Sequence, residues 1–147
     1  MKAKVIDSEL TYPIRRRILW PHITDGDYSL MIDRDPDTFH VGTFINNKIV
    51  SVGTFIKESN PKFKSSLQYR LRAMATDKDH QTKGCGKVLF LKGLEILKNK
   101  KIELLWCDAR VNAIPFYESL NMKSLNFVYS IKNIGPHKTM YIHLNEK

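Results

Sequence analysis

Apolar residues after residue 84 recur with the spacing of one face of an α-helix. The spacing predicts an amphipathic helix from Gly84, and the lysines within residues 98–101 suit its C-terminal end because they complement the helix dipole. We expect its buried stripe to consist of Val88, Leu89, Leu91, Leu94 and Leu97. The residues just before Gly84 therefore form a turn that leads into a helix.

Upstream of that turn, the chain has the shorter apolar runs that are typical of strands. Residues 39–45 and 49–57 predict two strands joined at Asn46-Asn47, and because asparagine tolerates positive φ we expect a tight antiparallel hairpin. Residues 67–76 predict the next strand. Alternation places Tyr69, Leu71, Ala73 and Ala75 on one face of it and Arg70, Arg72 and Met74 on the other.

The remaining patterns complete a mixed order of elements. Residues 2–6 predict a first strand, residues 11–19 a helix that ends at Trp20-Pro21, and residues 22–37 a long loop with a short helical turn. Residues 102–108 predict a central strand, and a second helix follows, capped by Asn112 and stopped by Asn121 in a left-handed conformation. Residues 122–130 and 138–144 predict the last two strands, separated by a turn at 133–136. The order β-α-β-β-β-α-β-α-β-β predicts an α+β sandwich with a mixed sheet, as one domain over residues 1–147.

Composition agrees with a single folded domain. With 147 residues and 42% hydrophobic residues the chain can fill one core. No apolar stretch approaches the ~20 residues that span a bilayer, and the N-terminus lacks an apolar signal region, so we expect a cytoplasmic protein without a membrane partner. Cys85 and Cys107 form no CxxC pair, so we expect two reduced thiols and no metal.

The net charge of +9 suggests an anionic ligand. Basic surfaces serve nucleic acids, membrane surfaces and polyanionic small molecules. The excess lysine and arginine is spread along the chain, and no nucleic-acid recognition motif accompanies it. We therefore favour the attraction of an anionic cofactor over nucleic-acid binding.

Residues 81–87, Gln-Thr-Lys-Gly-Cys-Gly-Lys, are the strongest candidate for that ligand's site. A glycine-rich turn at a helix N-terminus offers unpaired backbone N–H groups and a positive dipole end, which bind phosphates. The dinucleotide fingerprint requires a third glycine that is absent here, and the mononucleotide loop requires an earlier glycine and a hydroxyl that are also absent. The pattern that remains is Gln81-x-x-Gly84-x-Gly86 directly after a strand.

This pattern resembles the acyl-CoA motif of the GNAT superfamily of N-acyltransferases. The segment Asn112-Ala113-x-x-Phe116-Tyr117-x-x-x-Asn121-Met122 is similar to that family's second motif, with asparagine at 121 where glycine is usual. Together the motifs cover about residues 67–125. Gly135-Pro136-His137-x-x-Met140 also resembles the C-terminal end of small stand-alone bacterial members.

The resemblance implies a GNAT-type α/β/α sandwich with a mostly antiparallel sheet, which binds acetyl-CoA as co-substrate. It implies that backbone groups of Met74, Ala75 and Thr76 contact the pantetheine arm. Asn112 and Phe116 would contact the cofactor, and Tyr117 would be the general acid at the leaving sulfur. The pyrophosphate would lie at the turn, near Gln81, Thr82, Lys83, Gly84, Cys85, Gly86 and Lys87.

Several of these residues have alternative interpretations. Tyr117 could be a core aromatic, and Cys85 could be a nucleophile or, as we favour, a packed side chain. His137 is a candidate base or acceptor contact, or a surface or capping histidine. Arg72 could bind a carboxylate-bearing acceptor or form a surface ion pair with Glu58 or Asp108.

The sequence thus predicts a cytoplasmic N-acetyltransferase that moves an acetyl group from acetyl-CoA directly to a primary amine. The alternative is a non-catalytic acyl-CoA-binding or regulatory module of the same fold. The acceptor, a small-molecule amine or a peptide, is not encoded in the motifs. A homodimer is common in the family, and no interface can be derived from the sequence.

Overall fold

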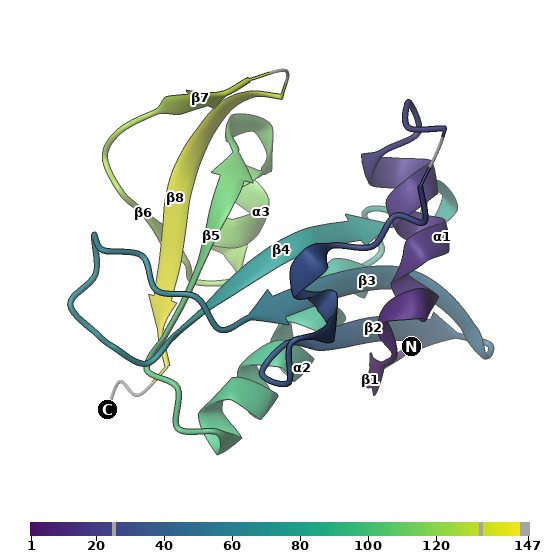
Figure 1. Ribbon diagram of the computed structural model, residues 1–147, viewed down its shortest axis with the longest axis horizontal. Coiled ribbons are helices and arrows are strands. Elements are labelled where there is room, and N and C mark those ends of the chain that lie inside the picture. The colour runs from purple at the N-terminus through teal and green to yellow at the C-terminus, as the bar shows by residue number, and fades with distance from the viewer. Residues whose placement is uncertain (25, 133, 145–147) are drawn as a thin grey trace.

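In the computed structural model, which describes residues 1–24, 26–132 and 134–144, eight strands form one sheet (Figure 1). The strands follow the order β1-β2-β3-β4-β5-β8-β6, and β7 also pairs with β8. The parallel pair is β4 with β5, and all the other pairs are antiparallel. The strand bounds are β1 Lys2–Ile6, β2 Phe39–Ile45, β3 Lys48–Ile56, β4 Gln68–Thr76, β5 Leu104–Arg110, β6 Lys123–Ser124, β7 Tyr129–Ile131 and β8 Gly135–His143.

Helices cover both faces of the sheet (Figure 1). The helices α2 (Cys85–Asn99) and α3 (Ile114–Ser119) belong to the larger hydrophobic core. On the opposite face lies an N-terminal helical segment, made of a 3-10 turn, α1 (Tyr12–Ile14) and a π-helical stretch over Arg15–Leu19. Its Ile14 packs with Ile6, Val52 and Ala75 in a second core cluster. The predicted α/β/α sandwich and mixed sheet are confirmed.

The parallel strands β4 and β5 separate after a short common stretch (Figure 1). They pair from Gln68 with Leu104 to Arg70 with Trp106, while β5 stays paired with β8 as far as Arg110. The gap that opens beyond Arg70 lies between the two halves of the sheet. It leaves the last part of β4 without a strand partner on that side.

A β-bulge at Ala73 changes the facing of β4 at this gap. Val52 pairs with Ala75 and Thr54 with Arg72, so β4 has one extra residue there, and Ala73 has a φ of 53°. The strict alternation that we predicted for residues 67–76 is wrong beyond the bulge. Met74 packs against the larger core and Ala75 against the opposite cluster, because the extra residue exchanges the two faces.

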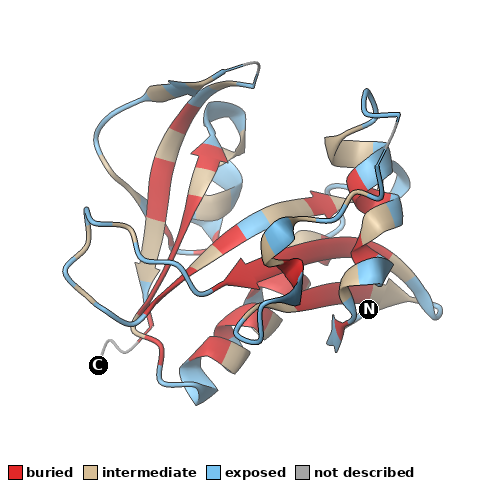
Figure 2. Cartoon of the chain, in the orientation of Figure 1, coloured by how far each residue is buried: buried red, intermediate tan, exposed pale blue. Residues whose placement is uncertain are grey.

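The buried face of α2 is also displaced from the prediction. Its buried residues are Cys85, Leu89, Phe90, Gly93, Leu94 and Leu97, whereas Leu91 is 49% exposed. Leu91 is about 200° around the helix axis from Leu89, so it cannot share the buried face. Figure 2 shows the buried residues along β2 and β3 and on the helix beside them. Phe90 and Gly93 take the place that we assigned to Leu91.

Gly93 permits a close approach between α2 and the Phe55 ring on β3. A Cβ atom at this position would lie 2.1 Å from Cζ of Phe55, which is fully buried. We expect Gly93→Ala to lower the free energy of unfolding by about 1–3 kcal/mol, since neither backbone can easily withdraw. The exposed Leu91→Ala on the same helix should change it by about 0.5 kcal/mol or less. Urea denaturation of both variants checks this, and equal effects would contradict the packing described.

The turns were predicted well and the C-terminal strands less so. Asn46, Asn47 and Asn121 have φ values of 50°, 65° and 70°, which confirms the hairpin turn and the helix stop. The strand predicted over residues 122–130 is wrong, because the chain leaves the sheet between β6 and β7. Asn112 does not cap a helix. It lies in a 3-10 turn, Val111–Ala113, before α3.

Two further predictions differ in detail. The N-terminal helix exists, but its turns are of mixed type rather than regular α-helix. In the predicted turn at 133–136, Asn133 lies outside the described residues, and β8 begins at Gly135. Among the described residues, no helix is long and apolar enough to cross a membrane.

Candidate active site

The glycine-rich turn opens helix α2 as an exposed bend. Thr82 and Gly84 have φ values of 65° and 86°, and Gly84 is the N-cap of the 15-residue helix. At the start of the helix, the Val88 N–H donates a hydrogen bond to the Gly84 carbonyl at 3.1 Å. The N–H groups of the preceding residues of the first turn therefore have no intrahelical acceptor. Lys83 and Lys87 are exposed beside them, so the turn offers amides and positive charge to an anion.

The same turn is fastened to the end of β4. The Gln81 side-chain amide donates a hydrogen bond to the Thr76 carbonyl at 3.0 Å. Cys85 is 1% exposed, and its carbonyl accepts a hydrogen bond from the Thr43 hydroxyl at 3.0 Å. A thiol in the core cannot reach a bound substrate, so the geometry supports the packing interpretation of Cys85.

Gly86 brings the three predicted cofactor segments together. A Cβ atom here would lie 3.1 Å from Cε of Met74 on β4 and 3.2 Å from Cζ of Phe116 on α3. The absent side chain therefore lets the end of β4, the start of α2 and α3 pack closely at this point. Phe116 and Asn112 are both exposed.

A cavity of about 280 Å³ occupies the gap between β4 and β5. Its lining includes Arg72 and Met74 from β4, Asp108 from β5, Tyr117 from α3 and His137 from β8. The structure therefore brings together the predicted acid, the candidate base and the candidate acceptor contact. The residues predicted to bind the pyrophosphate lie outside this cavity, at the turn.

Tyr117 is held as a protonated phenol in this cavity. Burial raises the pKa of Tyr117, and the neighbouring Cys107 raises it further. Its hydroxyl lies 3.9 Å from Sδ of Met74, and its ring meets Phe116 edge-on, with 5.1 Å between the centroids. A neutral phenol beside the gap is a proton donor.

His137 lies almost fully buried at the other side of the cavity. It is 4% exposed, and its Nδ1 lies 2.8 Å from the Gly135 carbonyl oxygen. A carbonyl can only accept, so Nδ1 is the donor in this bond, and in the neutral ring the lone pair is on Nε2. The ring also stacks on Tyr129, with 6.1 Å between the centroids. The buried position contradicts the surface interpretation of this residue.

The ion pair that we considered for Arg72 is formed by Arg70 instead. The Arg70 guanidinium donates to Asp108 at 2.8 Å and to Glu58 at 3.3 Å, and it lies over the Trp106 ring. Arg72 is exposed and makes no ion pair within residues 1–24, 26–132 and 134–144. Of the two alternatives considered for Arg72, the ion pair with Glu58 or Asp108 is therefore not formed. The alternation of β4 does not show whether Arg70 or Arg72 lies beside Asp108.

Tyr129 contacts the cavity residue Asp108, and the sequence did not identify this contact. Its hydroxyl donates to Asp108, and burial followed by this hydrogen bond raises the pKa of Tyr129 to about 12. Both oxygens of Asp108 are thus used, one by Arg70 and one by Tyr129. The strand pattern at Tyr129 gave no signal for this contact, since the partner lies on a different strand.

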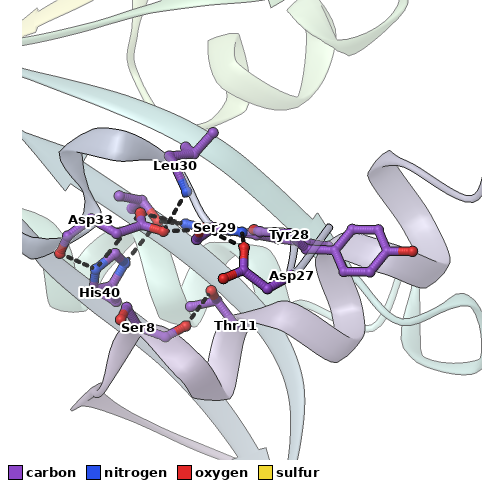
Figure 3. A network of polar contacts seen from close by, with 10 residues as sticks. Ser8, Thr11, Asp27, Tyr28, Ser29, Leu30, Asp33 and His40 are labelled. Carbon is purple, nitrogen blue, oxygen red and sulfur yellow. Dashed lines mark hydrogen bonds and ion pairs between the residues drawn. The ribbon is translucent and has the colours of Figure 1, made fainter. Parts of the chain in front are cut away.

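A buried ionic network joins the 3-10 turn Met31–Arg34 to the sheet (Figure 3). The fully buried guanidinium of Arg15 donates to both oxygens of Asp33 at 2.7 and 2.9 Å, and also to the Thr54 hydroxyl at 2.9 Å. Nδ1 of His40 lies 2.9 Å from the same hydroxyl, and its Nε2 lies 3.2 Å from the Asp33 carbonyl oxygen. Sequence reasoning missed this network, and the one available signal was Arg15 directly after the inward-facing Ile14.

The network predicts a loss of stability in acid. Burial lowers the pKa of His40 below its ordinary 6.5, so between the folded and unfolded values the unfolded chain binds more protons, and stability falls as the pH drops below 6.5. The pKa of Asp33 is also lowered, by the hydrogen bonds from Arg15 and Leu30 against the opposing effect of burial, so its stabilisation is lost as the pH falls through its folded value. Melting temperatures should therefore fall in two steps, and His40→Gln should remove the first. A first step that survives in that variant would contradict the assignment.

Comparisons with known proteins place this arrangement in a family. The sequence matches the Acetyltransferase (GNAT) family over residues 7–122. It is 32% identical over 141 residues to the uncharacterized N-acetyltransferase YitI of Bacillus subtilis (strain 168), and this match covers 96% of the chain and 95% of that protein. The chain therefore belongs to the acetyltransferase (GNAT) family, which confirms the resemblance seen in the sequence.

Solved structures show the same fold at low sequence identity. An aminoglycoside 6′-N-acetyltransferase complexed with coenzyme A has a TM-score of 0.79 at 12% identity, over 100% of this chain and 99% of that one. The ribosomal-protein-S18-alanine N-acetyltransferase of Escherichia coli has a TM-score of 0.74 at 18% identity, over 99% of this chain and 95% of that one. The acceptors in these two names, an aminoglycoside and a ribosomal protein, are different classes of molecule, so the fold does not define the acceptor.

Proposed function

We propose that the protein is an N-acetyltransferase that moves an acetyl group from acetyl-CoA to a primary amine by direct transfer. The observation that carries the proposal is the gap between β4 and β5, which has the anion-binding turn at one end and Tyr117 within its cavity. One domain over residues 1–147 and a cytoplasmic location remain part of this proposal.

The residues at the turn fit the cofactor in their chemistry and shape. The amides of residues 83–87, with Gln81 and Thr82 beside them, would bind the pyrophosphate. The unpaired edge of β4 at Met74, Ala75 and Thr76 would hold the pantetheine arm by backbone hydrogen bonds. The absence of a side chain at Gly86 keeps α2 close to Met74 and Phe116, and the exposed Phe116 and Asn112 would contact that arm.

Proton transfer is assigned to two residues of the cavity. Acetyl-CoA supplies an activated thioester. The Tyr117 phenol donates a proton to the leaving sulfur, which its raised pKa permits because it stays protonated near neutral pH. Nε2 of His137 accepts a proton from the acceptor ammonium, directly or through water. Arg72 lies at the acceptor side of the same cavity.

A thiol-release screen with acetyl-CoA and a panel of primary amines tests the proposal. We expect free CoA to appear only when a suitable amine is present. Binding of CoA without thiol release for any amine would instead support the alternative, a non-catalytic acyl-CoA-binding or regulatory module. Among the described residues, no group of His, Cys, Asp and Glu side chains is placed to hold a metal ion.

A further inference from the structure

A second hollow adjoins the cavity between β4 and β5 that contains Tyr117, which we call the transfer cavity. It has a volume of about 410 Å³ and lies between the loop after β3 and the strands β7 and β8. Arg70 and Asp108 line both hollows, so their ion pair forms the boundary between them. An acceptor that reaches Tyr117 from this side would pass over that pair.

The charges around the two hollows are unbalanced. The carboxylates of Glu58 and Asp108 are both paired with the same guanidinium, that of Arg70. By contrast, Arg72 in the first hollow and Lys62 in the second have no carboxylate partner within residues 1–24, 26–132 and 134–144. The unsatisfied charge facing an acceptor is therefore positive.

Aromatic rings form the apolar wall of the second hollow. Phe127 is 44% exposed, and the Lys62 ammonium lies 3.8 Å from the centroid of its ring and 5.6 Å from that of Tyr129. Trp106, from β5, also lines the hollow, and its indole N–H donates to the Glu58 carbonyl at 2.9 Å. The wall suits a flat or apolar group, with a cation available at its rim.

We propose that the acceptor is a primary amine that carries a carboxylate and an apolar body, as in an aromatic amino acid, and that Arg72 and Lys62 select the carboxylate while Phe127 contacts the body. The inference rests on the proposed function, and it names the substrate class for the same site. A carboxylate near Arg72 gains charge-assisted hydrogen bonds. Polycationic amines are disfavoured, because the unpaired cations repel them.

The cationic surroundings also help the chemistry. An amine must lose its proton before it can attack the thioester. Positive charges close to an ammonium group lower its pKa, so more of the bound amine is neutral at a given pH. The lowered pKa assists an acceptor that also carries a carboxylate, because the attraction between this carboxylate and the cations offsets the repulsion of its ammonium group.

The test compares phenylalanine with phenylalaninamide, which differ in the carboxylate. The ratio of their kcat/KM values is measured by thiol release for the parent protein and for Arg72→Gln, Lys62→Gln and the exposed loop control Lys64→Gln. We expect Arg72→Gln to lower the acid-to-amide ratio about tenfold or more, Lys62→Gln to lower it several-fold, and Lys64→Gln to leave it unchanged. The acidic limb of the pH profile should also shift upward in Arg72→Gln, which a purely structural role would not produce.

Two results would overturn the inference. One is an acid-to-amide ratio that is the same in the parent and in Arg72→Gln and Lys62→Gln. The other is a clear preference for a polycationic amine over the amino acid. Calorimetric titration of both ligands into the protein with CoA present separates this inference from the proposed function, because carboxylate-dependent binding that needs Arg72 would support the site even if no thiol were released.

Discussion

Replacement of Tyr117 by phenylalanine is expected to lower kcat on the order of 10²-fold or more, while the affinity for CoA stays unchanged. The substitution removes only the hydroxyl that lies 3.9 Å from Met74, and the ring that meets Phe116 remains. Because the raised pKa of Tyr117 keeps the phenol protonated, the parent protein should show no loss of this donor across the neutral range. Steady-state kinetics and calorimetric CoA titration measure the two quantities separately.

Tyr141→Phe is the matched control for this variant. Tyr141 lies on β8 and packs against Phe63 and His143, away from the lining of the transfer cavity. Its turnover should equal that of the parent. If Tyr117→Phe also turned over at the parent rate, the acid role would be wrong and Tyr117 would be a packing residue.

The second large effect concerns stability. Asp33→Asn should lower the free energy of unfolding by about 3–5 kcal/mol, because it leaves the buried Arg15 guanidinium without its counter-charge. The control is Asp7→Asn. Asp7 is exposed and its side chain makes no capping hydrogen bond to the helix that follows it, so this substitution should lower the free energy of unfolding by about 0.5 kcal/mol or less. Urea denaturation monitored by circular dichroism provides both values.

A double variant separates the ion pair from simple loss of packing. Arg15→Met combined with Asp33→Asn removes both charges, so it should cost less than the sum of the single substitutions. Strict additivity would contradict the view that the cost arises from an uncompensated buried charge. The same helical stretch, Arg15–Leu19, contributes its last residue, Leu19, to the lining of the transfer cavity.

Local chemistry made much of the fold and part of the site predictable. Asn46-Asn47 and Asn121 were placed correctly because positive φ values are restricted to few residue types. The turn before α2 was recognisable because Gly84 must adopt φ of 86° where the helix begins. Such turns depend on the identity of one or two residues, so they can be predicted from the local sequence.

The features that the sequence did not predict depend on contacts between distant elements. The bulge at Ala73 arises from the pairing of β4 with β3, and the alternation of residues 67–76 does not predict it. The Arg15–Asp33 pair joins positions 18 residues apart, one in the N-terminal helical segment and one in the 3-10 turn Met31–Arg34. The choice of Arg70 over Arg72 as the partner of Asp108 requires the geometry of β4 beside β5. In each case the sequence contains the residues but does not show which distant residues they contact.

Direct transfer in the gap between β4 and β5 is tested most directly by following a labelled acetyl group during a single turnover. The protein is mixed with acetyl-labelled acetyl-CoA and an accepted amine, and the masses of protein and acceptor are recorded over time after quenching. We expect the label to pass from acetyl-CoA to the acceptor amine and never to be found on the protein, in keeping with the buried positions of Cys85 and Cys107. A labelled protein that forms first and then loses its acetyl group to the acceptor would contradict it.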